Sequence, residues 1–108
     1  MSGLLFPNGA LPVNRIKWLR LALADLDEII AFIAADNPKA AAGLATRIWQ
    51  TVSLLPEQPA MGRSGRVPGT RELVISGTPL IVPYRCIAGE IQILRVLHGT
   101  RKWPENFR

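Results

Sequence analysis

Residues 23–55, LADLDEIIAFIAADNPKAAAGLATRIWQTVSLL, decide the fold of this chain. In the first part of the stretch, large apolar residues recur every three or four positions, which is the spacing of one face of a helix. This stripe consists of Leu23, Leu26, Ile29, Ile30 and Ile33. The second part repeats the spacing with Ala41, Leu44, Ile48, Val52 and Leu55. The sequence therefore predicts two amphipathic helices, over roughly 22–36 and 38–55.

The segment 36–38, Asp-Asn-Pro, separates the two predicted helices. Asn is a good N-cap and Pro is well placed at the first helical position, so these residues end one helix and start the next. A tight helical hairpin follows, and Pro56 marks its end. Three acids early in the first helix are expected on a solvated face, where the helix dipole favours them: Asp25, Asp27 and Glu28.

The second half of the chain contains strand signals. Residues 56–70 are rich in Gly and Pro and are expected to form a loop that carries Arg63 and Arg66. Three strand-like segments then follow closely, at 71–76 (RELVIS), 80–87 (LIVPYRCI) and 90–97 (EIQILRVL). Short turns join them, which indicates an antiparallel meander. Pro83 cannot donate to the sheet and favours an edge or a bulge.

Upstream, residues 14–19 (NRIKWL) alternate polar and apolar side chains and predict a first strand. The expected fold is α+β, in the order β-α-α-β-β-β, with the helical hairpin packed on one face of a mostly antiparallel sheet. At 108 residues the chain is the size of one domain, expected over 14–108. Residues 1–13 are expected to be a flexible N-terminal extension.

The composition limits the classes of protein and of site. Cys86 is the only cysteine and His98 the only histidine, which excludes an intrachain disulfide and a Cys/His zinc site, and no cofactor is expected. Cys86 alternates with Tyr84 along a predicted strand and is expected to be buried. No apolar run approaches the ~20 residues that span a bilayer. A cytoplasmic protein without a membrane partner is expected.

The positive charge is concentrated in the second half. The net charge is +5, yet residues 1–60 balance five basic against five acidic residues, whereas residues 61–108 hold eight basic and three acidic ones. A basic face there would attract nucleic acid or an acidic protein. The alternative is that the basic residues only keep a small protein soluble.

Four segments resemble the RelE/ParE superfamily of toxins from type II toxin-antitoxin systems, and especially its ParE-like branch. They are LADLDEIIAFIAADNPKAA (23–41), GRSGRVPGTRELV (62–74), PYR (83–85) and EIQILRVLHGTR (90–101). The resemblance covers residues 14 to about 103. It implies a toxin neutralised by a cognate antitoxin of the ParD or RelB kind, which folds on the toxin and alone contacts operator DNA.

The superfamily contains two activities. RelE-like members are ribosome-dependent mRNA endoribonucleases, whereas ParE-like members inhibit DNA gyrase and are not themselves enzymes. The ribonucleases commonly have an Arg three residues before the strand Tyr, where this chain has Ile81. They also tend to have lysines ahead of the meander, and no lysine occurs here between Lys39 and Lys102. The ribonucleases further tend to have a Tyr or His close to the C-terminus; after Leu97 this chain has His98 but no Tyr. These departures favour the ParE-like activity and leave the ribonuclease open.

Eight residues are the candidates for binding the target: Arg63, Arg66, Arg71, Arg85, His98, Arg101, Lys102 and Trp103. The loop arginines could hold phosphates or be simply solvated. Arg85 should project to the sheet face opposite Tyr84, or else form an edge ion pair. His98 could transfer a proton near neutral pH, or bond a backbone carbonyl in a structural role. Trp103 could contact the target or fold back onto the sheet.

Three functional hypotheses follow. The first is a gyrase inhibitor without catalytic residues. The second is a ribonuclease acting on mRNA in the ribosome, with Arg85, His98 and Arg101 as its catalytic residues. The third is a chain that has lost toxicity and remains the antitoxin-binding partner in an autorepressing complex. All three predict an antitoxin.

Overall fold

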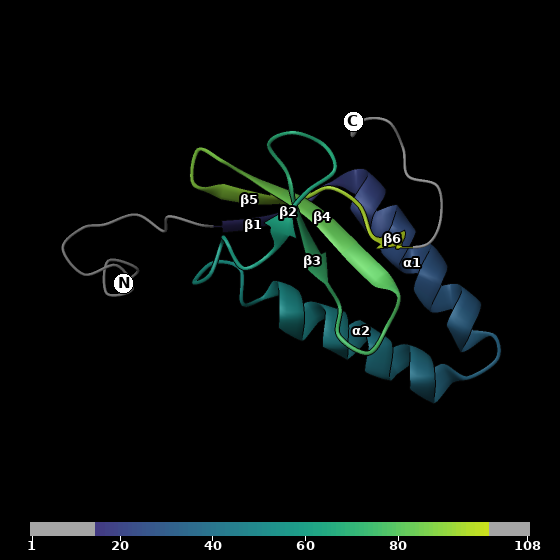
Figure 1. The fold of residues 1–108 in the computed structure, drawn as a ribbon. Coiled ribbons are helices and arrows are strands. Elements are labelled where there is room, and N and C mark those ends of the chain that lie inside the picture. Colours follow the sequence, from purple (N-terminus) through teal and green to yellow (C-terminus); the bar gives the residue numbers. More distant parts are fainter. Residues whose placement is uncertain (1–14, 100–108) are drawn as a thin grey trace, which may run out of the picture.

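The computed structural model describes residues 15–99, in which two helices pack against one face of a sheet (Figure 1). The helices are α1 (Arg20–Ala34) and α2 (Pro38–Val52). The strands are β1 (Arg15–Trp18), β2 (Arg63–Ser64), β3 (Arg71–Val74), β4 (Leu80–Ile87), β5 (Glu90–Ile93) and β6 (Leu97–His98). The expected α+β class and order are confirmed. The additional strand β2 lies in the predicted loop, and the expected extension of residues 1–13 lies outside the described residues.

The helical hairpin forms at the predicted place. The side chain of Asn37 accepts a hydrogen bond from the backbone N of Ala40 at 3.0 Å, and Pro38 occupies the first turn of α2. These local contacts start α2 directly after α1 ends.

Among the described residues, neither helix is long and apolar enough to cross a membrane.

The core lies between the hairpin and the sheet. Its buried members are Ala22, Leu26, Ile48, Val52, Leu55, Leu73, Ile75, Leu80, Val82, Tyr84, Ile91, Ile93 and Val96. The predicted stripe of α1 is wrong at Leu23, which is 43% exposed because the buried side of α1 is centred on Ala22 and Leu26. The expected burial of Cys86 is also wrong: this side chain is exposed, because the β4–β5 hairpin extends beyond the helices (Figure 1).

The sheet order is β1-β5-β4-β3-β2, with β6 pairing with β4 beyond the end of β5. The meander β3-β4-β5 is antiparallel, as predicted. β1 pairs with β5 in parallel, with Ile16 opposite Ile91. The first described strand is thus an edge strand held by the last part of the chain, and the helical hairpin forms the connection between β1 and the rest of the sheet.

Pro83 lies where the pairing of β4 changes partner. β4 pairs with β5 in the register Tyr84↔Ile93 and with β6 in the register Ile81↔Leu97, so the register shifts by one residue between them. The N of Leu94 donates to the carbonyl of Pro83 at 2.9 Å, and Pro83 has no N–H to return the bond. The shift is a β-bulge, as predicted for Pro83. It also divides the predicted strand 90–97 into β5 and β6.

Asp25 connects α1 to this bulge. Its carboxylate accepts two hydrogen bonds from Arg95, at 2.7 and 3.0 Å, and one from the backbone N of Val96, at 3.0 Å. The expected solvated position is therefore wrong for Asp25, whereas Asp27 and Glu28 are exposed as predicted. The hydrogen bonds that Arg95 donates to Asp25 raise the pKa of Arg95, which stays a cation. Helix and sheet are thus joined by a charged contact beside the core.

Candidate functional site

The sheet face opposite the helices carries the polar residues of the strands. The helices cover the Tyr84 side, so Arg85 points to the other face, as its alternation with Tyr84 predicts. Directly paired residues share a face. Two cross-strand rows therefore lie on this face, namely Lys17–Gln92–Arg85 and Arg63–Glu72–Pro83. We call this side of the sheet, together with the β2–β3 loop above it, the open face.

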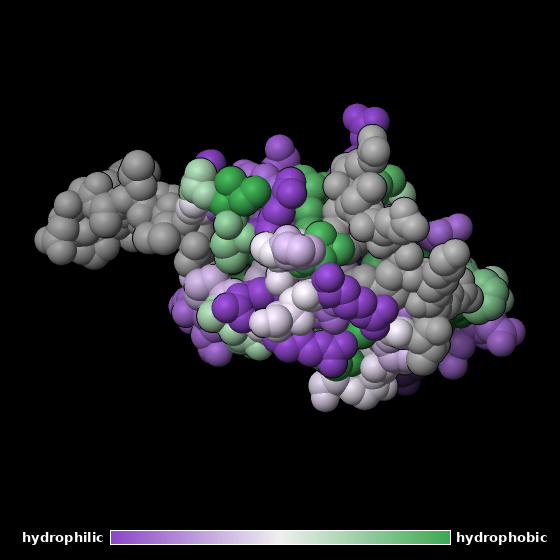
Figure 2. Space-filling model, turned by 45° about the horizontal axis from the view of Figure 1, so that its top comes forward, coloured by the Kyte–Doolittle hydropathy of each residue, from purple (hydrophilic) through white to green (hydrophobic). Residues whose placement is uncertain are grey.

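The open face is basic. Its cationic side chains are exposed or half-buried: Arg15, Lys17, Arg63, Arg66 and Arg85. Its acids on the strands are Glu72 and Glu90, so among the described residues of the open face the basic groups outnumber the acidic ones by five to two. In Figure 2 the top of the Figure 1 view is turned toward the reader, and hydrophilic residues make up much of this side, with smaller hydrophobic areas between them.

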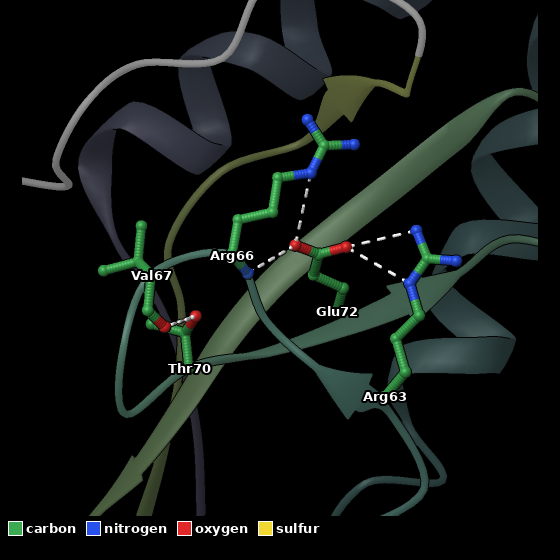
Figure 3. Close-up of polar contacts among 5 residues, drawn as sticks. All are labelled: Arg63, Arg66, Val67, Thr70 and Glu72. Atoms are coloured by element: carbon green, nitrogen blue, oxygen red, sulfur yellow. Dashed lines mark hydrogen bonds and ion pairs between the residues drawn. The ribbon is translucent and has the colours of Figure 1, made fainter.

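A buried carboxylate organises the loop end of the open face (Figure 3). Glu72 is only 3% exposed, yet both of its oxygens are engaged. Oε1 accepts from Arg63, whose Nη2 and Nε lie 3.1 and 3.2 Å away. Oε2 accepts the backbone N–H of Arg66 at 2.9 Å, and the Nε of Arg66 lies 3.7 Å from it. One buried charge thus orients two arginines whose side chains remain about half exposed, at 56% and 49%.

The loop between β2 and β3 is closed by its own backbone. The N of Gly65 donates to the carbonyl of Thr70 at 2.9 Å, and the hydroxyl of Thr70 donates to the carbonyl of Val67 at 2.6 Å. A Cβ on Gly65 would collide with Thr70, and Gly69 has a φ of +83°, a value that L side chains rarely adopt. The glycines let the loop turn tightly enough to place Arg66 over Glu72.

Arg71 and Tyr84 fix the base of the loop from the helix-covered side. They are paired directly across β3 and β4, and so share that face. Arg71 donates to the carbonyl of Gly62 at 2.8 Å and to that of Ala60 at 3.3 Å. The hydroxyl of Tyr84 accepts from the N of Gly62 at 2.9 Å and donates to the carbonyl of Pro59 at 2.8 Å. The structure therefore places Arg71 away from the open face, in a contact with the backbone.

The Tyr84 hydroxyl has both a donor and an acceptor partner, and the ring is fully buried. Burial raises the pKa of this hydroxyl above its ordinary value of 10.0, and the hydrogen bond from Gly62 opposes the shift only partly. A tyrosine in this position holds its proton at neutral pH. Its role is to fix the backbone, and its pKa does not suit a general base.

Arg85 is oriented from the neighbouring strand. Its Nε donates to the side-chain oxygen of Gln92 at 2.7 Å, and the amide nitrogen of Gln92 donates to Glu90 at 2.9 Å. The alternative expected for Arg85 was an ion pair at the edge of the sheet. Instead, Gln92 lies between Arg85 and Glu90 and is hydrogen-bonded to both. Lys17 stands on the other side of Gln92, across β1 and β5.

The other candidates do not meet Arg85 within the described residues. His98 pairs with Leu80 in the β4–β6 ladder, and Leu80 belongs to the helix-covered core, so His98 is on the face opposite Arg85. Leu80 and Arg85 are five residue steps apart along β4, which is about 16 Å. The candidates Arg101, Lys102 and Trp103 lie outside the described residues. Over residues 15–99, no three His, Cys, Asp or Glu side chains gather as metal ligands would.

Sequence reasoning missed the central role of Glu72. An acidic residue inside an apolar strand, RELVIS, with two arginines shortly before it, is the available signal. A buried carboxylate requires charged or hydrogen-bonding partners, and Arg63 and Arg66 lie only nine and six residues before it. Asp25 and Arg95 offered no such signal, because they are 70 residues apart.

Comparison with known proteins assigns the chain to a family. The model of the ParE toxin of type II toxin-antitoxin systems, parDE, matches residues 16–103. The chain belongs to this family. The expected resemblance to RelE/ParE toxins is thereby confirmed, and the protein is a toxin of the type II toxin-antitoxin class. Membership of a toxin-antitoxin system implies a cognate antitoxin as the partner of this protein.

Individual relatives of this ParE-family chain agree with the assignment. It is 48% identical over 92 residues to "Putative toxin Y4kP" of Sinorhizobium fredii, covering 85% of this chain and 95% of the relative. It is 30% identical over 80 residues to "Toxin RelE1" of Caulobacter vibrioides, covering 72% and 85%. A solved structure, "Chromosomal ParDE TA system from P. aeruginosa", matches with a TM-score of 0.75 and 33% identity over 82% of this chain and 98% of that chain.

Proposed function

We propose that this ParE-family toxin inhibits DNA gyrase by binding to the gyrase–DNA complex in the cytoplasm, without catalysing a reaction itself. The proposal includes a ParD-like antitoxin that neutralises it and that alone contacts operator DNA. The family match over residues 16–103 supports the ParE-like activity. The open face and the C-terminal residues Arg101, Lys102 and Trp103 are the proposed target contacts.

The separation of Arg85 from His98 is the observation that carries this proposal. RNA cleavage through the 2′-hydroxyl needs a proton acceptor, a proton donor and a cation around one phosphodiester. Arg85 and His98 lie on opposite faces of the sheet, about 16 Å apart along β4. Tyr84 is also held on the helix-covered side by two backbone hydrogen bonds. This arrangement favours binding over acid–base catalysis.

The helical hairpin offers the proposed antitoxin an apolar surface. Phe32 on α1 is 82% exposed and Trp49 on α2 is 51% exposed. Leu21, Leu23 and Leu54 add further exposed apolar area on and next to these helices. Where exposed apolar side chains lie together, they typically mark a surface that a partner covers. An amphipathic antitoxin segment that folds on the hairpin would cover them.

Two assays run on one preparation of the full chain test the function. The first measures DNA supercoiling by purified gyrase, and the second measures mRNA cleavage on programmed ribosomes. We expect loss of supercoiling, accumulation of cleaved DNA and intact mRNA. An Arg85→Gln variant should lose potency in the gyrase assay, whereas Lys39→Gln, at an exposed position on α2, should not.

The ribonuclease is the second candidate, because the chain is 30% identical to a protein named "Toxin RelE1". Cleavage of mRNA at the ribosome with unaffected gyrase would overturn the first proposal and make Arg85, His98 and Arg101 the catalytic candidates. Inactivity in both assays, with retained antitoxin binding, would support the third hypothesis of a non-toxic partner.

A further inference from the structure

The cations of the open face are spread across its full width. Lys17 lies on the edge strand β1, Arg85 on the central strand β4, and Arg63 on β2 at the far edge. Neighbouring strands are about 4.8 Å apart, so the four spacings from β1 to β2 place Lys17 and Arg63 roughly 20 Å apart. Arg15 and Arg66 add one cation near each end of this line.

We propose that the open face binds the phosphate backbone of duplex DNA. A duplex carries about one negative charge per 1.7 Å of its axis when both strands are counted, so a 20 Å length holds on the order of 12 phosphate charges, about six on each strand. The open face presents several cations along that length. This deepens the proposed function and rests on it for the source of the DNA, which is the duplex held by gyrase.

Two of the arginines are already oriented before any ligand arrives. Gln92 holds the Nε of Arg85 at 2.7 Å, and the buried Glu72 holds Arg63 through two nitrogens. A guanidinium that is fixed in one orientation loses less conformational entropy when it binds a phosphate. Glu72 is 3% exposed, and its negative charge is offset by Arg63 and Arg66, whose side chains are about half exposed, so this cluster keeps a net charge of +1.

The chemistry of the open face favours DNA over an acidic protein. The cores of protein interfaces are enriched in aromatic side chains and depleted of charge. The exposed aromatic residues among the described positions, Phe32 and Trp49, are on the helices, not on the open face. Across the middle of the open face, Lys17, Gln92 and Arg85 form a row of long polar side chains, which suits contacts with phosphate oxygens.

The test is the binding of a short fluorescent DNA duplex to the full chain without gyrase, followed by fluorescence anisotropy over a series of salt concentrations. Each phosphate contact contributes about 0.9 to the slope of log K against log salt. We expect Lys17→Gln and Arg85→Gln each to reduce the slope by about one, and the double variant to reduce it by about two. The matched control, Lys39→Gln, removes one exposed cation from α2 and should leave the slope unchanged.

Variant chains must first show the melting temperature of the wild type, so that a lost contact is distinguished from a lost fold. Equal effects of the three single variants would overturn the proposal, because attraction would then depend on net charge and not on the open face. Displacement of the duplex by polyglutamate as effectively as by unlabelled DNA would overturn it in favour of an acidic protein. Absence of wild-type DNA binding at low salt would also overturn it.

The supercoiling assay separates this inference from the proposed function. DNA binding that depends on Lys17 and Arg85, with gyrase unaffected, would retain the DNA surface and refute the gyrase target. Gyrase inhibition that Lys17→Gln and Arg85→Gln leave intact would retain the target and refute the surface. We expect both variants to weaken DNA binding and gyrase inhibition in parallel.

Discussion

Replacing Asp25 by Ala should destabilise the toxin more than any other change of a single charged residue on α1. The carboxylate of Asp25 accepts two hydrogen bonds from Arg95 and one from the backbone N of Val96. The side chains of Asp25 and Arg95 are only 14% and 22% exposed. The variant leaves a largely buried guanidinium and a backbone N–H without their acceptor.

The magnitude follows from these contacts. Removing one partner of a buried ion pair costs about 3–5 kcal/mol, and a buried donor without an acceptor costs about 1–3 kcal/mol. Because Arg95 retains some contact with water, we expect a loss of about 3 kcal/mol in the free energy of unfolding. At about 4–8 °C per kcal/mol, the melting temperature should fall by roughly 12–24 °C.

Urea unfolding followed by circular dichroism measures this loss. The matched control is Asp27→Ala, which removes an exposed carboxylate two residues along the same helix and should change the free energy by less than about 0.5 kcal/mol. Asp25→Asn should fall between the two, because its amide oxygen can still accept from Val96. In a double-mutant cycle, Asp25→Ala and Arg95→Ala should show a coupling energy of about 0.5–3 kcal/mol. Equal stabilities of the Asp25→Ala and Asp27→Ala variants would refute the reasoning.

Three further predictions concern the tyrosine, the α2 cap and the antitoxin. Tyr84 is the only tyrosine, so ultraviolet absorbance titrates it alone, and its midpoint in the folded chain should exceed 10.0. The pKa of Tyr84 is higher in the folded chain than in the unfolded chain. The stability that Tyr84 contributes is therefore fully present below about pH 10 and is lost as the pH rises through the pKa of the folded state. A midpoint equal to that of the denatured chain would contradict this. Asn37→Ala removes the cap of α2 and should cost about 1 kcal/mol in urea unfolding, with Asp36→Ala as the control that should cost less. A cognate antitoxin at 100 times its Kd should stabilise the toxin by about 2.7 kcal/mol in a thermal melt, and Phe32→Ser should weaken that effect without destabilising the free chain; an unchanged melting temperature would argue against binding.

Local signals predicted the two helices, the first strand and the meander, but not β2 or the division of 90–97 into β5 and β6. The hairpin follows from Asn37 and Pro38, whose capping contacts act within three residues. The meander follows from strand segments joined by short turns, and the bulge follows from the missing N–H of Pro83. Each of these depends on interactions between residues close in sequence, or on the covalent structure of one residue.

The errors arise where distant parts of the chain decide the outcome. Periodicity placed Leu23 on the buried stripe, but the sheet packs against the side centred on Ala22 and Leu26. Cys86 alternates correctly with buried neighbours, yet the helices do not reach the end of β4. Asp25 is recognised as an ion-pair partner only when the fold brings Arg95 to it.

The candidate site was predicted as residue types and not as an arrangement. Charge alone indicated Arg63, Arg66 and Arg85, and alternation gave the face of Arg85. The cross-strand position of Lys17 depends on the parallel pairing of β1 with β5, which has no local signal. Patterns among neighbouring residues therefore did not predict that Lys17 lies on the open face, and Lys17 was not among the candidates.

The parallel pairing of β1 with β5 also determines when the open face can be completed during synthesis. Chains are made from the N-terminus, so β1 emerges early and waits for residues 90–93 before it can pair. Closing a segment of this length costs about 4 kcal/mol of chain entropy, which only a nearly complete core can offset. The row of Lys17, Gln92 and Arg85 therefore cannot form until β5 has been synthesised. A fragment that ends before β5 lacks this row and, with it, part of the proposed DNA contact.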